Sequence, residues 1–293
     1  MKNIIIPVDF SEDSLHALDL AVLFSEILRL NVQMVYVLKK SGDYLPHSVD
    51  EEKYWAEDKF KKIIDNYSPK LKNESRLRFI TKQGKIYKEV VNQAESYKEC
   101  LIMASTHGAS GFEELFIGSN AYKIISATKL PVITIRKGNE AQKITKIVMP
   151  LDMVNETRQK VPITTEIAKL FGAEIHVVTV STSKDERIKS KLEGYQKQVS
   201  EYIQNQDVPV VNDALIGKNI TDITLEYTDK VDADFISIMT EQETDFKNLF
   251  IGDYALQMIT KSDVPVLSIT PQTFSKPGDS FFTFGATGLN QQF

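Results

Sequence analysis

The sequence is poor in the residues and segments that mark several classes of protein. Its single cysteine, Cys100, excludes an intrachain disulfide and a multi-cysteine metal site, and fits a reducing compartment. The 13 glycines and 10 prolines among 293 residues are too few for a low-complexity chain. No apolar run approaches the roughly 18–20 residues that span a bilayer. The apolar start, 1–9, is too short for a signal peptide, so we expect a cytoplasmic protein without a membrane segment.

An excess of positive charge is also missing. Lysine and arginine number 35 against 40 acidic residues, a net charge of −5, which argues against a nucleic acid as partner. The chain contains no HExxH, no GxSxG and no P-loop lysine motif, so we predict no catalytic residue and no metal site. Of the four histidines, His107 is expected to shape a loop and His176 to be a hydrogen-bonded core residue. Cys100 is expected to be buried and inert.

The sequence contains an internal repeat. Four blocks recur in the same order: 3–9 as 146–152, 32–37 as 175–180, 115–118 as 249–252, and 130–132 as 264–266. Recurrence in one order makes chance a poor explanation. We predict domains at 1–138 and 144–272, a polar linker around 136–143, and a tail at 273–293. The phenylalanines of that tail fit disorder or docking on a surface equally well.

Each copy alternates short apolar runs with longer amphipathic stretches. This pattern predicts βαβ units, which form a doubly wound α/β domain with a five-stranded parallel sheet and helices on both faces. Such sheets bind ligands beyond the carboxyl ends of their strands, where the strand order reverses. The expected strands are 4–8, 32–38, 77–81, 100–104 and 132–135 in the first copy, and about 146–151, 174–180, 208–216, 234–239 and 265–270 in the second.

The loop after the fourth strand of the first copy is typical of a phosphate site. Gly108 follows the strand, where a missing Cβ lets a backbone approach a ligand. Nine residues later, Gly118 and Ser119 open a helix whose first amides and dipole suit a phosphate. The alternative is that the glycines only shape turns and that Ser119 caps the helix.

The stretches 101–108 with 118–119, 7–11 and 130–132 resemble the universal stress protein family. Its ATP-binding members carry glycine, two residues, glycine, nine residues, then glycine followed by serine or threonine. This chain fits at Gly108, Gly118 and Ser119, and departs at Ser105, where the family has glycine. The resemblance covers residues 1 to about 272 as a tandem pair. It implies a Rossmann-like fold of the adenine nucleotide α-hydrolase type.

The resemblance also implies a nucleotide site in the first copy. Asp9 would contact the nucleoside, although an Asx-turn is an equal alternative. Val37 would pack on adenine, although core packing is the simpler role for a valine. The ligand would be ATP or a related nucleotide, with the need for Mg²⁺ or Mn²⁺ left open. The implied site residues are Pro7, Val8, Asp9, Val37, Ala104, Ser105, Gly108, Gly118, Ser119 and Asn120.

The second copy lacks most of the residues that form the predicted phosphate site of the first. Met239 stands where Ser105 was, Gln242 where Gly108 was, and Asp253 where Ser119 was, while Gly252 is kept. A carboxylate at Asp253 would repel a phosphate, and we expect it to cap the following helix itself. We therefore predict that the second copy does not bind ATP, and that Asp152 has a turn role.

The resemblance implies a regulatory stress-response protein, not an enzyme. The two copies would pair along their fifth strands as an intrachain pseudo-dimer, and an exposed edge would favour a homodimer. Two alternatives are an interaction module without a nucleotide and a slow ATPase.

Overall fold

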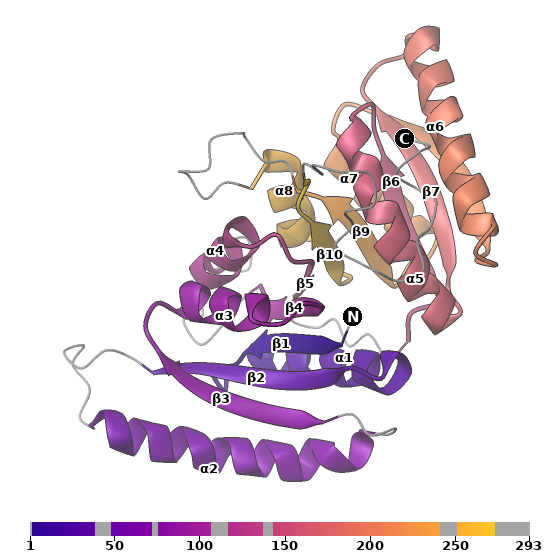
Figure 1. Ribbon diagram of the computed structural model, residues 1–293. Helices are drawn as coiled ribbons and strands as arrows, with labels where there is room; N and C mark the ends of the chain where they lie inside the picture. Colours follow the sequence, from indigo (N-terminus) through magenta and orange to yellow (C-terminus); the bar gives the residue numbers. More distant parts are fainter. Residues whose placement is uncertain are drawn as a thin grey trace. The chain divides into compact units, whose positions relative to one another are not determined.

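A computed structural model describes residues 2–38, 48–71, 76–106, 117–136, 143–240 and 251–272. The chain divides into two compact units, one ending at Gln142 and the other starting at Lys143 (Figure 1). Predictions about Gly108, His107, Gln242, the linker 137–142 and the tail 273–293 fall outside the described residues.

The first unit is a parallel sheet in the order β3-β2-β1-β4-β5. Strands and helices alternate along the chain, as expected from the sequence. The elements are β1 (Asn3–Pro7), α1 (Glu12–Leu28), β2 (Asn31–Leu38), α2 (Val49–Tyr67), η1 (Ser68–Lys70), β3 (Leu77–Gln83), α3 (Ile86–Glu95), β4 (Cys100–Ser105), α4 (Ser119–Ala127) and β5 (Val132–Ile135).

The second unit repeats this arrangement in the order β10-β9-β6-β7-β8. The elements are β6 (Lys146–Leu151), η2 (Asn155–Lys160), α5 (Val161–Phe171), β7 (Glu174–Ser181), α6 (Glu186–Gln204), β8 (Val210–Ile216), α7 (Ile220–Lys230), β9 (Phe235–Met239), α8 (Asp253–Lys261) and β10 (Val266–Ile269). The expectation of two doubly wound, Rossmann-like domains is confirmed.

The chain leaves the first strand of each sheet in one direction and later returns to extend the sheet in the other. Right-handed crossovers then place α1 and α2 on one face of the first sheet and α3 and α4 on the other (Figure 1). Tyr36 of β2 contacts Glu52 of α2, whereas Gln33 contacts Gln93 of α3, which fits these two faces. The unit therefore has two distinct layers of helices around one sheet.

Local sequence explains where helices start. Ser11 caps α1 by accepting the Ser14 N–H at 3.2 Å, and Glu12 and Asp13 lie in the first turn, where the helix dipole favours acids. Cys100 is buried in β4, as expected, and burial raises the pKa of its thiol to about 12, which disfavours the reactive thiolate. In the described ranges we find no helix long and apolar enough to cross a membrane.

Candidate functional site

The predicted site residues on β1, β2 and β4 lie at the carboxyl ends of these strands. Pro7, Val8 and Asp9 follow one another at the carboxyl end of β1. Val37 is near the end of β2, and Ala104 and Ser105 end β4. Since β1 lies between β2 and β4, these are the carboxyl ends of three adjacent strands. The strand order reverses between β1 and β4, which is where ligands of this fold class bind.

Strand register sorts these side chains between the two faces of the sheet. Pro7 pairs with Val35. Val37 lies two residues beyond Val35 and therefore shares its face. Ile5 pairs with both Gln33 and Ile102, so Ala104, two residues beyond Ile102, also lies on that face. It is the face of α3 and α4, since Gln33 contacts α3.

Ser105 lies on the other face, because neighbouring strand residues alternate. Val8 alternates with Pro7 in the same way and is buried. The side chain at the one position that departs from the family pattern is therefore directed away from the face that carries Val37 and Ala104.

Asp9 sits in a tight turn after β1. Its Oδ1 accepts the Ser11 N–H at 3.0 Å and also the Ser11 hydroxyl, which is the Asx-turn considered from the sequence. The residue is nonetheless exposed. The Asx-turn considered from the sequence is thus present, at a residue that solvent reaches.

An aromatic cluster holds this turn in place. Phe10 has φ of 64°, a left-handed conformation that costs a bulky residue energy. Its ring centroid lies 5.1 Å from Tyr36, 5.1 Å from Trp55 and 4.9 Å from Phe60, all on the α2 side. The Tyr36 hydroxyl donates to Glu52 at 2.8 Å, and burial together with that bond raises the pKa of the phenol. Sequence reasoning missed this cluster, because its members are far apart along the chain.

The N-terminus of α4 is open to solvent. Gly118 is the N-cap, with φ of −59° and ψ of 142°, and no side chain caps the helix among the described residues. Ser119 and Asn120 follow in the first turn and are exposed. The first amides of a helix have no partner within the helix, so they can bind an anion.

A backbone bond fixes this helix end to the sheet. The Gly118 N–H donates to the Thr106 carbonyl at 2.7 Å, and the Thr106 N–H donates to Ile135 at 2.8 Å. Thr106 directly follows β4 and is buried. The helix N-terminus is thereby tied to the end of β4, next to the strand ends that carry the other predicted residues.

The second unit keeps this backbone but changes the side chains. Gly252 is the N-cap of α8, with φ of −58° and ψ of 152°, nearly the values of Gly118. Asp253 is the first residue of the helix and is exposed, and no side chain caps α8 among the described residues. The expectation that Asp253 caps its own helix is therefore wrong, because glycine takes the cap position in both units. The negative charge at the helix end remains.

The second unit also buries a lysine that the sequence analysis did not single out. Lys160 is 1% exposed, and its Nζ donates to the Thr157 carbonyl at 2.7 Å. Burial lowers the pKa of this amine to about 7, against a smaller opposing effect of Asp152. Asp152 accepts the Val154 N–H at 2.8 Å, so its predicted turn role is confirmed. An alignment of the two copies would have drawn attention to this lysine, since Lys160 takes the place of Ala17, which is buried.

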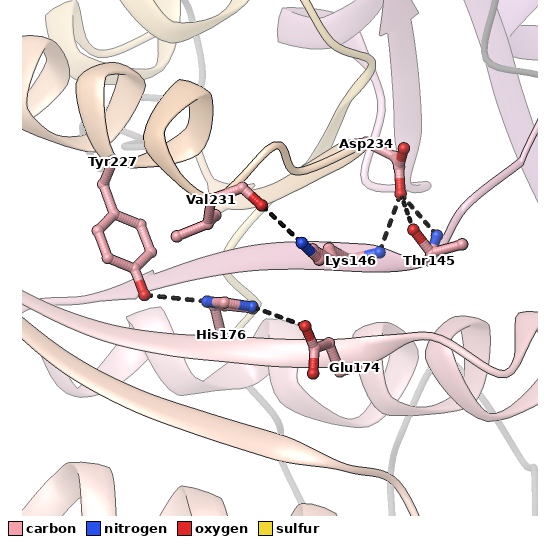
Figure 2. Close-up of polar contacts among 7 residues, drawn as sticks. All are labelled: Thr145, Lys146, Glu174, His176, Tyr227, Val231 and Asp234. Atoms are coloured by element: carbon pink, nitrogen blue, oxygen red, sulfur yellow. Dashed lines mark hydrogen bonds and ion pairs between the residues drawn. The ribbon is translucent and has the colours of Figure 1, made fainter.

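His176 is a hydrogen-bonded core residue, as predicted. It is 5% exposed, its Nδ1 lies 2.9 Å from the Tyr227 hydroxyl and its Nε2 lies 3.2 Å from Glu174 (Figure 2). Among the described residues, no group of three or more His, Cys, Asp or Glu side chains could hold a metal ion.

Comparison with known proteins gives matches along nearly the whole chain. The model of the universal stress protein family matches residues 1–136 and again 143–269. A universal stress protein of Methanocaldococcus jannaschii is 28% identical over 146 residues, which are 46% of this chain and 82% of that protein. A crystal structure of a universal stress protein from Archaeoglobus fulgidus has a TM-score of 0.75 at 19% identity, covering 92% of this chain and 98% of that chain. The last likeness shows the fold.

Proposed function

Because this chain belongs to the universal stress protein family, we propose that its first unit binds an adenine nucleotide, ATP foremost, as a regulatory ligand. Other members of the family have been solved with cAMP and with dAMP. The assignment to this chain rests on its own residues. The observation that carries it is the uncapped start of α4 at Gly118, joined by a backbone bond to the end of β4.

The proposed orientation follows from the two faces of the sheet. Phosphates would meet the first amides of α4 and the Ser119 hydroxyl, where the helix end carries a partial positive charge. The base would pack on Val37 and Ala104, which lie on the face of α3 and α4. Asp9, exposed at the end of β1, would accept a hydrogen bond from a ribose hydroxyl.

We propose that the second unit binds no nucleotide. Its helix start has the same backbone as that of α4, so the difference lies in charge. Two unit charges 4 Å apart repel by about 1 kcal/mol in water and about 4 kcal/mol at an effective dielectric constant of 20. Asp253 would therefore weaken phosphate binding by roughly 5-fold to 1000-fold. The role of this unit would be to respond when occupancy of the first unit changes the pairing of units or chains.

Nucleotide release tests the proposal. The purified protein is denatured, and the supernatant is examined by absorbance at 260 nm and by mass spectrometry, in parallel with thermal unfolding in saturating ATP and Mg²⁺. We expect released adenine nucleotide or a rise in melting temperature. No release together with no thermal shift would reject the nucleotide and favour an interaction module.

A matched pair of variants locates the ligand. Ser119→Asp gives α4 the start that α8 has, whereas Asn66→Asp adds the same charge at an exposed position of α2. We expect the first variant to lose the thermal shift and the second to keep it. Equal behaviour of the two would show that the nucleotide binds elsewhere.

A further inference from the structure

The turn that follows β1 is strained at one residue. Phe10 has φ of 64°, a left-handed conformation that is unfavourable for a bulky side chain. Such strain persists only where the surrounding contacts enforce it, and it is concentrated at functional sites. Phe10 directly follows Asp9, the residue that we propose to meet the ribose, so the strain lies beside the proposed ligand.

The second unit shows that this connection can form without the strain. Asp152 Oδ1 accepts the Val154 N–H at 2.8 Å. The equivalent bond in the first unit joins Asp9 Oδ1 to the Ser11 N–H at 3.0 Å. Met153, the central residue of the second turn, has no positive φ. The same hydrogen bond therefore closes without a left-handed residue in the unit for which we propose no nucleotide.

The two turns are consequently of different types. An Asx-turn mimics a backbone β-turn, and the types of β-turn differ in the sign of φ at a central residue. The φ and ψ angles of that residue lie within the hydrogen-bonded ring that joins the carboxylate to the N–H two residues later. The left-handed Phe10 therefore determines how the Asp9 carboxylate and the peptide group after it are directed at the end of β1.

The ring of Phe10 is anchored by other rings of the first unit. Its centroid lies 5.1 Å from Tyr36 of β2, and 5.1 Å and 4.9 Å from Trp55 and Phe60 of α2. Phe60 is fully buried and stacks on Phe79 of β3, with centroids 4.6 Å apart and ring planes inclined by 13°. The strained residue is thereby connected to β2, α2 and β3, and these contacts offset the cost of its conformation.

The corresponding positions of the second unit carry no aromatic rings. Met153 stands where Phe10 does, and Thr179 stands where Tyr36 does. The left-handed turn and its aromatic anchor thus occur together in the unit with the proposed site, and both are missing at these positions of the other unit.

We propose that Phe10 is a positioning residue of the nucleotide site, whose anchored ring holds the Asp9 carboxylate toward the ribose and so makes the site selective for a sugar with free hydroxyls. This role rests on the proposed nucleotide function. A carboxylate can accept several hydrogen bonds, so the turn and a ribose hydroxyl can share Asp9. Prior alignment raises the affinity gained from that bond, because the carboxylate loses little conformational entropy on binding.

Sugar selectivity reports this role directly. The full chain, first freed of bound nucleotide, is titrated calorimetrically with ATP and with 2′,3′-dideoxy-ATP, which keeps the base and the phosphates but lacks both ribose hydroxyls. We expect the wild type to bind ATP at least about 10-fold more tightly, since a hydrogen bond to a charged group is lost with the analogue, and we expect Asp9→Ala to remove this preference. Phe10→Gly should also remove most of it, by weakening ATP alone, because glycine adopts the left-handed conformation but has no ring to hold it.

Phe79→Leu is the control for a merely structural effect, because Phe79 stacks on Phe60 at the far end of the cluster from the turn. This variant should keep the preference for ATP. The role of Phe10 would be overturned, with nucleotide binding left intact, if Phe10→Gly were as selective as the wild type, if Phe79→Leu lost as much selectivity, or if the wild type bound both nucleotides equally. Binding of neither nucleotide to the wild type would instead reject the proposed function, and this role with it.

Discussion

The two units share a fold but differ in the chemistry of single buried residues. Lys160 is enclosed by its own unit, with one hydrogen bond to a carbonyl, where the first unit has Ala17. An ammonium group is costly to bury without a close counter-ion, which is why its pKa falls to about 7. Nothing in the local sequence Arg158-Gln159-Lys160 marks this lysine as buried, since such a stretch is usually solvated.

Replacing Lys160 should stabilise the protein at neutral pH. The unfolded lysine takes up its proton near 10.5, whereas the folded one does so only near 7, so the buried amine lowers stability as pH falls from 10.5 to 7 and by a constant amount below. We expect Lys160→Met to raise the free energy of unfolding at pH 7 by on the order of a few kcal/mol. Urea unfolding at pH 7 and pH 10 measures the gain.

The exposed Lys169 of α5, the helix that follows Lys160, provides the control. Lys169→Met should change stability little at either pH. A Lys160→Met gain that is as large at pH 10 as at pH 7 would show that packing, not desolvation of the amine, is responsible.

At the scale of elements, the sequence was informative where periodicity is strong. Continuous apolar runs such as 4–6 and 101–104 predicted buried parallel strands, and these lie in β1 and β4. Ser11 predicted the start of α1, because a serine before acidic residues is a frequent cap. The same preference wrongly predicted that Asp253 caps α8, whereas Gly252 is the residue at the cap position. Side-chain clusters such as that of Phe10 depend on tertiary contacts, which one sequence does not reveal.

A carboxylate placed at the start of α4 should stabilise the nucleotide-free protein and at the same time weaken nucleotide binding. Gly118→Asp places a good capping side chain at a cap position whose φ of −59° any residue can adopt. We expect the nucleotide-free protein to gain roughly 0.5 kcal/mol, while nucleotide binding is lost through charge repulsion. Thermal unfolding with and without ATP gives both effects. A variant that loses stability without ligand would indicate that the glycine is needed for the fold.

The start of α8 offers the reverse experiment. Because its backbone matches that of α4, Asp253→Ser with Gln242→Gly should add weak nucleotide binding to the second unit. The measurement is a titration in the Ser119→Asp background, where the first unit is silent. If no binding is gained, differences beyond these two positions separate the units.

In the molecule as a whole, the family model matches two units of the same fold, and we propose a nucleotide site in the first of them alone. The repeat within the sequence was enough to predict the duplication. It could not predict how the units cooperate, because pairing depends on surfaces that periodicity does not describe. The copies differ in charge at the two helix starts, and the second buries Lys160 where the first has Ala17.

Calorimetric titration of the full chain with ATP and Mg²⁺, on protein first freed of bound nucleotide, tests the central claim most directly. We predict a stoichiometry of one nucleotide per chain, abolished by Ser119→Asp and unchanged by Asn66→Asp. Two nucleotides per chain would contradict the proposed silence of the second unit, and no binding would contradict the assignment of the first.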